Sequence, residues 1–225
     1  MKRLGLLLLP ILAITLMLGG SAFAQDPYPG DGSYYFVTYY SNANTSGAPD
    51  GTLRIINDAD YETSETDGAA NNGFLWAAIY VFDDSQEMRS CCACFVSPDG
   101  LLSESVNKEL TADEFTGRGQ IQRGVIKVVS STSNDPTAAS PYTGLRGWMT
   151  HIQATTNGIP VYPATCTGDC ALDTSKGPWF VTETPLADSN LTSLELGNLD
   201  YLCSYGLTIG SGYGRCPCTP EDYDF

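Results

Sequence analysis

The spacing of eight cysteines constrains the fold of this chain more than any other sequence feature. The set comprises Cys91, Cys92, Cys94, Cys166, Cys170, Cys203, Cys216 and Cys218. Cysteines that are adjacent, or that are separated by one residue, do not readily pair because the ring so closed is strained. We therefore expect each cysteine of the triplet at 91–94 to bond one of Cys203, Cys216 and Cys218. Cys166 and Cys170 then close a small loop of their own.

The cysteines of the triplet are also expected to point to different faces of a strand. In an extended strand, Cys92 and Cys94 face one side of the sheet and Cys91 faces the other. Bonds from the triplet to the C-terminal cysteines close long loops, for which chain entropy predicts roughly 4–5 kcal/mol for a first crosslink. A zinc or iron–sulfur site built from CCxC and CPC is one alternative, and a redox-active CxC is another. Export and the presence of a single histidine favour disulfides.

The N-terminal residues indicate export. A basic start and an apolar segment at 4–18 lead to the small-residue site Ala22-Phe23-Ala24. This order predicts a signal peptide over residues 1–24, and the alternative is an uncleaved membrane anchor. No later segment has the ~20 apolar residues of a membrane span. We therefore expect a secreted or cell-surface protein, with no membrane span after signal cleavage.

The charge of the chain excludes two classes of partner. The formal net charge is −15 at pH 7, and cleavage of the signal would remove the basic residues Lys2 and Arg3 as well. A field of this sign repels nucleic acid phosphates and anionic lipid headgroups, so neither is an expected partner. Hydrophobic residues make up 42% of the chain, which is too many for a disordered polymer.

Short strand-like segments dominate the rest of the sequence. They lie at residues 33–40, 52–56, 74–82, 90–96, 101–106, 120–130, 145–153 and 178–184. Turn-rich loops separate them, and this pattern predicts a mainly β fold, an antiparallel β-sandwich stapled by disulfides. Residues 108–114 alone have helical composition in the middle of the chain. We expect a flexible N-terminal arm at 25–32 and a single domain at 33–225.

One amphipathic helix is predicted near the C-terminus, at about residues 193–205. Thr192 and Glu195 fit a capping box, in which each side chain accepts a hydrogen bond from the other residue's backbone amide. Apolar residues then recur at helical spacing through Cys203, and Gly206 is a reasonable end. The helix should lie on the sheet and direct Cys203 inward.

Residues with catalytic potential are sparse. His151 is the only histidine, and its place in a strand favours a structural, hydrogen-bonded role over a base. The chain has no G-x-S-x-G elbow, no phosphate loop and no G-x-G-x-x-G after a strand. A pair of carboxyl groups can hydrolyse glycosides without a histidine. Glu183 is the strongest single candidate for such a catalytic carboxylate. We assign no catalytic residue.

An acidic loop offers a possible ligand set for calcium. Asp58, Asp60 and Glu62 place carboxylates at alternate positions, and hard cations need several oxygens converging from one loop. The EF-hand glycine is missing, because Thr63 stands in its place. The alternative is a solvated acidic loop. No other cofactor is expected.

The first predicted strand has an unusual composition. Residues 33–40 carry neither charge nor proline, and aromatic or β-branched groups point to both faces; they include Tyr34, Tyr35, Phe36, Val37, Tyr39 and Tyr40. Such a strand can complete the sheet of another subunit, and head-to-tail donation of this kind builds open polymers. The alternative is that the strand pairs within its own sheet.

Several motifs together resemble a group of uncharacterised exported bacterial proteins with a CCxC…CxC framework. They are SNANTSGAPDGTLRIIN, IYVFDDSQEMRSCCACFVSPDG, RGWMTHIQ, the capped helix with Cys203, and GSGYGRCPC. The resemblance covers most of the chain after the signal. It implies a recurring cysteine framework and a cell-envelope or extracellular setting, and it implies no catalytic residues. The 166–170 pair and the tyrosine-rich start are less typical of that group.

Three functions from different classes fit these features. The first is a non-catalytic structural or surface protein, including a self-assembling filament subunit whose partner is another copy. The second is a secreted module that binds carbohydrate or a cell surface. The third is a hydrolase that uses carboxylates. Heavy crosslinking with sparse catalytic chemistry favours the first two.

Overall fold

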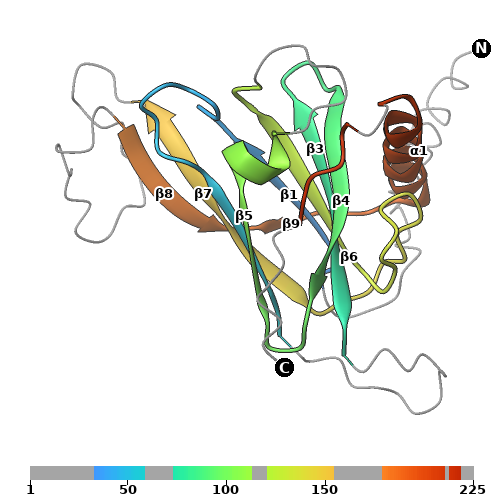
Figure 1. Cartoon of the computed structure of the whole chain (residues 1–225). Helices are drawn as coiled ribbons and strands as arrows, with labels where there is room; N and C mark the ends of the chain where they lie inside the picture. Colours follow the sequence, from blue (N-terminus) through green and yellow to red (C-terminus); the bar gives the residue numbers. More distant parts are fainter. Residues whose placement is uncertain (1–32, 59–72, 113–120, 155–178, 211–212, 219–225) are drawn as a thin grey trace, which may run out of the picture.

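A computed structural model describes residues 33–58, 73–112, 121–154, 179–210 and 213–218. Two antiparallel sheets form a sandwich, as Figure 1 shows. The strand order is β4-β3-β6-β1-β9 in the five-stranded sheet and β5-β2-β7-β8 in the four-stranded sheet. The predicted mainly β sandwich with one C-terminal helix is confirmed.

The strands agree in place with the segments expected from the sequence. The five-stranded sheet contains β1 (Tyr35–Tyr40), β3 (Leu75–Asp83), β4 (Met88–Val96), β6 (Gly124–Ser131) and β9 (Ala187–Asp188). The four-stranded sheet contains β2 (Thr52–Asn57), β5 (Leu101–Ser105), β7 (Leu145–Ala154) and β8 (Trp179–Pro185). The two-residue strand β9 was not predicted. At the start of the segment with helical composition, the chain forms one π-helical turn, η1 (Val106–Leu110). Residues 113 and 114 of that segment lie outside the described residues.

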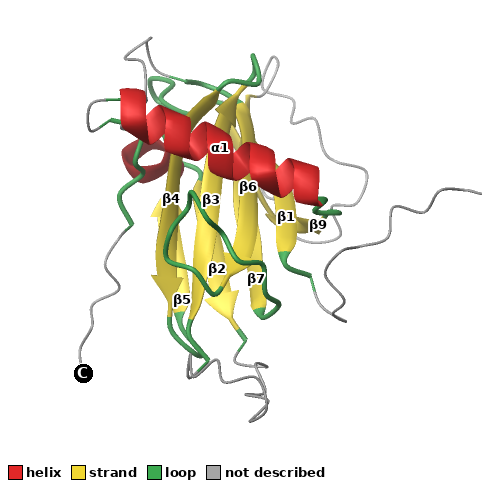
Figure 2. Cartoon of the chain, turned by 90° about the vertical axis from the view of Figure 1, so that its right-hand side faces the viewer, coloured by secondary structure: helices red, strands yellow, loops and turns green. Residues whose placement is uncertain are grey.

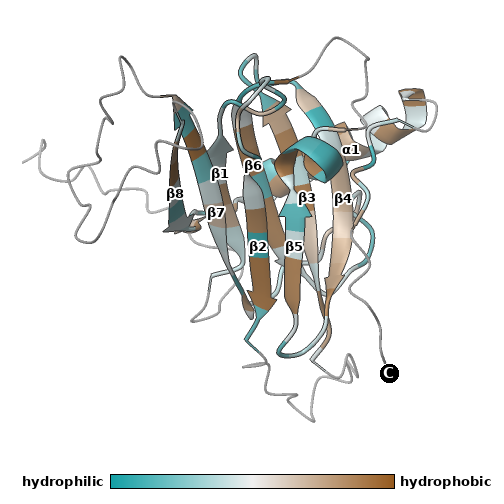
Figure 3. Ribbon diagram, turned by 60° about the vertical axis from the view of Figure 1, so that its left-hand side comes forward, coloured by the Kyte–Doolittle hydropathy of each residue, from teal (hydrophilic) through white to brown (hydrophobic). Residues whose placement is uncertain are grey.

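Apolar side chains fill both sides of the five-stranded sheet. Along β3, Ile79 and Val81 face the space between the sheets, whereas Tyr80 belongs to a second cluster beneath the C-terminal helix. Burial on both faces explains why β3 is almost continuously apolar. Figure 3 shows hydrophobic residues running through the central strands.

The chain crosses between the sheets at both of their edges. A turn at Ser97–Gly100, closed by a 2.8 Å hydrogen bond from the Gly100 amide to the Ser97 carbonyl, joins β4 to β5. On the opposite side, Leu186 joins β8 to β9, and its amide donates to the Gly147 carbonyl at 2.9 Å. The two sheets are thus connected at each margin of the sandwich.

One glycine is required by a close backbone approach. A Cβ atom on Gly124 would lie 1.8 Å from the Phe82 carbonyl oxygen, so any side chain there would force the strands apart. The Tyr40 hydroxyl donates to the same carbonyl at 3.0 Å. This position therefore ties β1, β3 and β6 together.

Helix α1 (Ser193–Ile209) crosses the outer face of the five-stranded sheet, as Figure 2 shows. The Thr192 hydroxyl accepts from the Glu195 amide at 3.1 Å, which confirms the predicted N-cap. The helix continues past Gly206, which is buried within it, and ends at Gly210. Among the described residues, no helix is both long enough and apolar enough to cross a membrane.

Candidate functional site

Three disulfides connect β4 to the C-terminal part of the chain. They are Cys91–Cys203, Cys92–Cys216 and Cys94–Cys218, with Cα–Cα distances of 5.9, 5.3 and 5.3 Å. Each triplet cysteine is bonded to one of the three C-terminal cysteines, as their spacing predicts. The expected bond between Cys166 and Cys170 lies outside the described residues.

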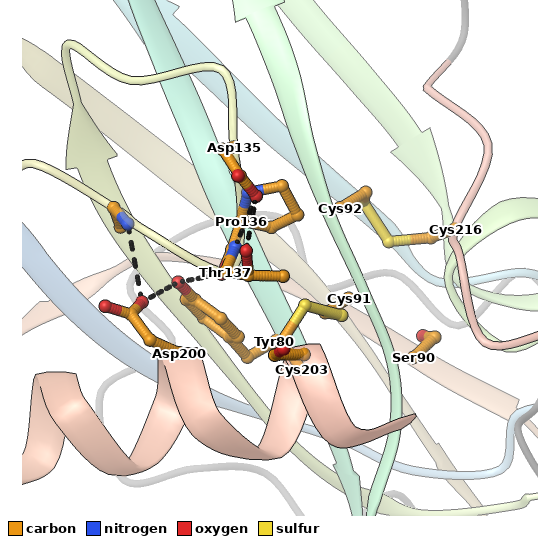
Figure 4. The surroundings of a disulfide bond; sticks show 12 residues. Tyr80, Ser90, Cys91, Cys92, Asp135, Pro136, Thr137, Asp200, Cys203 and Cys216 are labelled. Atoms are coloured by element: carbon orange, nitrogen blue, oxygen red, sulfur yellow. Dashed lines mark hydrogen bonds between the residues drawn. A yellow bond between two sulfur atoms is a disulfide. The ribbon is translucent and has the colours of Figure 1, made fainter. Parts of the chain in front are cut away.

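The disulfides lie on both faces of β4. Cys91 and Cys203 are buried in the cluster beneath α1, and Cys92 and Cys94 belong to the core between the sheets. Figure 4 shows Cys91–Cys203 beside the helix and Cys92–Cys216 on the other side of the strand. The alternation expected for the triplet is thus present, and the two faces of one strand hold two different parts of the C-terminus.

The C-terminal tail covers the outer edge of β4. The Cys91 amide donates to the Gly214 carbonyl at 2.9 Å, and Cys91 forms a parallel bridge with Arg215. Unpaired edge strands are prone to pair with other chains, so this cover blocks one route of aggregation. The sulfur atoms of Cys92, Cys94 and Cys218 lie within 4.8 Å of one another, but all three are bonded in disulfides and offer no thiolate to a metal.

A buried polar network reinforces the attachment of α1. The Tyr80 hydroxyl lies 2.9 Å from the Pro136 carbonyl oxygen and 3.3 Å from Asp200 Oδ1 (Figure 4). Burial raises the pKa of both the Tyr80 hydroxyl and the Asp200 carboxyl, so Tyr80 stays protonated. The Asp200 carboxyl also accepts from the Ala139 amide at 3.4 Å. This network fixes α1 to β3 and to the loop before Tyr142.

Glu195 anchors the first turn of α1 to the sheet. Its carboxylate accepts a hydrogen bond from the Tyr35 hydroxyl at 3.0 Å and another from the Lys127 ammonium. Burial acts to raise the pKa of Glu195, but the bonds from Lys127 and Tyr35 together outweigh it and lower the pKa. The Glu195 carboxylate, which the capping box predicts to accept from the Thr192 amide, thus binds two residues of the sheet.

The residues expected to mediate assembly lie in the chain's own sheet. Strand β1 pairs along its whole length with β6, and Phe36 and Val37 also pair with β9. Tyr34, Tyr35, Phe36 and Tyr40 are buried, Val37 is half-buried and Tyr39 is exposed. The structure therefore shows the alternative arrangement, in which this strand belongs to its own core.

His151 occupies a buried position near one end of the sandwich. Its Nε2 atom lies 2.7 Å from Thr184 Oγ1, and its ring stacks on Tyr39 with centroids 4.1 Å apart. Burial lowers the pKa of His151, and the nearby Tyr39 backbone partly offsets this effect. These contacts are those of a structural histidine that is neutral at pH 7.

We expect His151 to make stability depend on pH. The folded state lowers its pKa below the unfolded value of 6.5, so the unfolded chain binds more protons and stability falls as pH drops through 6.5. One such group changes the free energy of unfolding by at most about 1.4 kcal/mol per pH unit. Urea unfolding of the wild type and of His151→Gln between pH 7.5 and 5.5 tests this. Parallel pH dependence of the two proteins would contradict it.

Glu183, the carboxylate singled out from the sequence, forms an ion pair. Its side chain and that of Arg54 are close partners, and both are about half exposed on the outer side of the four-stranded sheet. The Arg54 guanidinium also donates to Thr150 Oγ1 at 3.2 Å. Glu183 is thus one member of a cross-strand pair over β2, β7 and β8.

Asp58 is the one described residue of the expected calcium set. Its carboxylate accepts from the Arg146 guanidinium at 2.6 Å, so a cation already neutralises it. Asp60 and Glu62 lie outside the described residues. Calcium binding therefore stays a prediction, and Arg146 is the group with which the metal would compete.

A groove of about 580 Å³ opens beside the first residues of β7. Strand β8 pairs with β7 only from Trp148 onward, because the chain leaves at Pro185 to cross to the other sheet. The residues that line the groove include Trp148, Arg146, Asp58 and Asp188. No sequence motif marks this groove, although Arg146 and Trp148 alternate with the buried residues of β7.

An aromatic ring beside charged hydrogen-bonding groups suits a polar ligand with an apolar face. The volume of the groove lies within the range of small-molecule sites. Comparison with known protein families, curated proteins and solved structures finds no match for this chain.

Proposed function

We propose that this is a non-catalytic structural or cell-surface protein of an oxidising, extracellular setting. The observation that carries the proposal is the set of three disulfides, which fasten α1 and the tail across a single edge strand. Disulfides persist in oxidising compartments, where they stabilise the folded state of secreted proteins. The protein would act by binding through its surface, and the disulfides would keep it folded outside the cell.

The residues with catalytic potential support this proposal by the contacts they make. His151 packs on Tyr39 and binds Thr184, and no acid contacts its ring in the described part of the chain. Glu183 is held by Arg54 in an exposed pair. A glycosidase needs two carboxyl groups facing one bond, and ion pairing with an arginine opposes the acid role.

Assembly through the N-terminal strand is the less favoured form of the proposal. Donation of β1 to another subunit would break its pairing with β6 and withdraw Phe36 and Tyr40 from the core. It would also break the hydrogen bonds from Ser41 and Asn42 to the Ile152 carbonyl. These contacts favour a different surface for assembly.

A test of the proposal combines a search for turnover with electron microscopy of the secreted protein. Incubation with polysaccharide, ester and peptide substrates should release no product above the blank. Assemblies, or retention at the cell surface, should be visible by microscopy. Product release that Glu183→Gln abolishes, with the fold intact, would overturn the non-catalytic assignment.

The groove favours carbohydrate binding as a second candidate function. Aromatic rings stack on sugar rings, and charged side chains hydrogen-bond to hydroxyl groups, so Trp148 and Arg146 form a suitable pair. On a glycan array, Trp148→Ala should weaken binding at least tenfold, which corresponds to about 1.4 kcal/mol. Trp76→Ala, in a different sheet, is the matched control. An equal signal from wild type and Trp148→Ala would remove this candidate.

A further inference from the structure

Helix α1 has an apolar face on the side opposite the sheet. The large hydrophobic side chains exposed on it are Leu194, Tyr201, Leu202, Tyr205 and Ile209, which we call the outer face of α1. Leu194 is 73% exposed and Tyr201 is 65% exposed. The inner face is also apolar, and the exposed polar residues of the helix, Ser193, Asn198, Ser204 and Thr208, are all uncharged. Figure 2 shows α1 lying across the five-stranded sheet, so that one side of the helix is turned away from both sheets.

The spacing of the outer face is that of a helix packing seam. Tyr201 follows Leu194 by seven residues, and Tyr205 follows Tyr201 by four, so these side chains form one stripe. The rings of Tyr201 and Tyr205 stack with centroids 6.1 Å apart. Exposed clusters of large apolar and aromatic residues mark interaction surfaces, and tyrosine is enriched there.

The outer face carries no charge, although the chain has a net charge of −15. The helix contains two acidic residues and no basic residue. Both acids bind the body of the protein, Glu195 through Lys127 and Tyr35, and Asp200 through Tyr80 and Ala139. An uncharged face is where two molecules of the same high charge can approach with the least repulsion.

The stripe is also self-complementary. A two-fold axis between Tyr201 and Leu202 would place Leu194 of one copy opposite Ile209 of the other. The same axis would bring the two Tyr201 side chains together at the centre. Antiparallel pairing further sets the positive end of each helix dipole beside the negative end of its partner. Apart from the backbone of the helix itself, no atom lies within 4 Å of a Cβ added at Gly197, so packing within the chain does not require this glycine. Its missing side chain leaves room for a close neighbour.

We propose that the outer face of α1 binds the same face of a second copy, in an antiparallel, two-fold symmetric contact. The inference rests on the proposed structural role and names its assembly surface. The symmetry makes the contact isologous, so α1 closes a dimer. Longer assemblies would need a second, separate surface.

Sedimentation velocity on the folded, disulfide-intact protein from about 1 μM to about 1 mM tests the contact. We expect a concentration-dependent dimer, and we expect Tyr201→Glu with Tyr205→Glu to weaken it at least tenfold. Val181→Glu, an exposed apolar residue of β8, is the matched control and should leave the dimer unchanged. Circular dichroism should show the same fold in all three proteins.

A single engineered cysteine tests the geometry. Tyr201→Cys should form a disulfide-linked dimer, because the two copies of this position meet at the axis. Ile209→Cys should not, because antiparallel pairing holds its two copies about 22 Å apart along the helices. A wild type that stays monomeric at all concentrations, or a dimer insensitive to the double tyrosine variant, would overturn the proposal. Substrate turnover, measured separately, would contradict the non-catalytic role without affecting this result.

Discussion

Complete reduction of the three disulfides is expected to unfold the protein at room temperature. The bond between Cys92 and Cys216 joins residues 124 positions apart, and a first crosslink of this length contributes about 5 kcal/mol in the chain-entropy model. Domains are typically stable by about 5–15 kcal/mol in total, so this term alone can equal the whole margin. Loss of the near-ultraviolet circular dichroism signal and of the cooperative unfolding transition would show it.

A single disulfide removed alone has a smaller expected effect. With the other two bonds intact, Cys91–Cys203 closes only a short ring through Cys92 and Cys216, which corresponds to about 3 kcal/mol. Cys91→Ser with Cys203→Ser should therefore lower the free energy of unfolding in urea by about that amount. Ser204→Ala, at an exposed neighbour, is the control and should have little effect. A fully reduced protein that keeps its cooperative transition would contradict this account of the fold.

Phe36→Ala is expected to cost about 3–5 kcal/mol of stability, the usual range for truncating a buried aromatic side chain. Phe36 is 4% exposed and packs in the core between the sheets. Thr38→Ala, in the same strand at a half-buried position, should cost less than about 1 kcal/mol. Urea unfolding of the two variants measures the difference.

The same experiment distinguishes the two roles considered for β1. If the strand belongs to its own core, Phe36→Ala destabilises the monomer. If the strand serves chiefly to complete another subunit, Phe36→Ala leaves the monomer stable and reduces assembly. A monomer that loses less than about 1 kcal/mol would favour strand donation over the arrangement in the structure.

The sequence predicts those parts of the fold that depend on local periodicity. The apolar run of β3 indicates a strand buried on both faces, and the triplet in β4 alternates because neighbouring strand residues point to opposite sides. Thr192 is an N-cap because its hydroxyl lies close to the Glu195 amide in any helix that starts there. These features need no information about distant residues.

Features that depend on tertiary contacts were not predictable in the same way. The Glu195 carboxylate fits a capping box locally, but it accepts hydrogen bonds from Lys127 and Tyr35 on the sheet. Strand β9 has two residues and exists because Leu186 carries the chain across the sandwich. The groove beside Trp148 arises where β8 stops pairing with β7, which no local pattern reports.

The cysteine framework accounts for how the C-terminal part of the chain is held to the sandwich. The disulfides explain why α1 and the tail stay attached to β4, and they fit an oxidising setting. The outer face of α1 and the groove beside Trp148 are the two surfaces through which the proposed structural or binding role can be tested separately.

Non-reducing peptide mapping of the secreted protein is the decisive measurement, because the attachment of α1 and of the tail to the edge of β4 depends on the crosslinks. We expect linked peptides containing Cys91–Cys203, Cys92–Cys216 and Cys94–Cys218. Total mass before and after alkylation gives the number of free thiols, which should be zero for these six cysteines. A bond within the triplet at 91–94, or free thiols that hold zinc, would contradict the account.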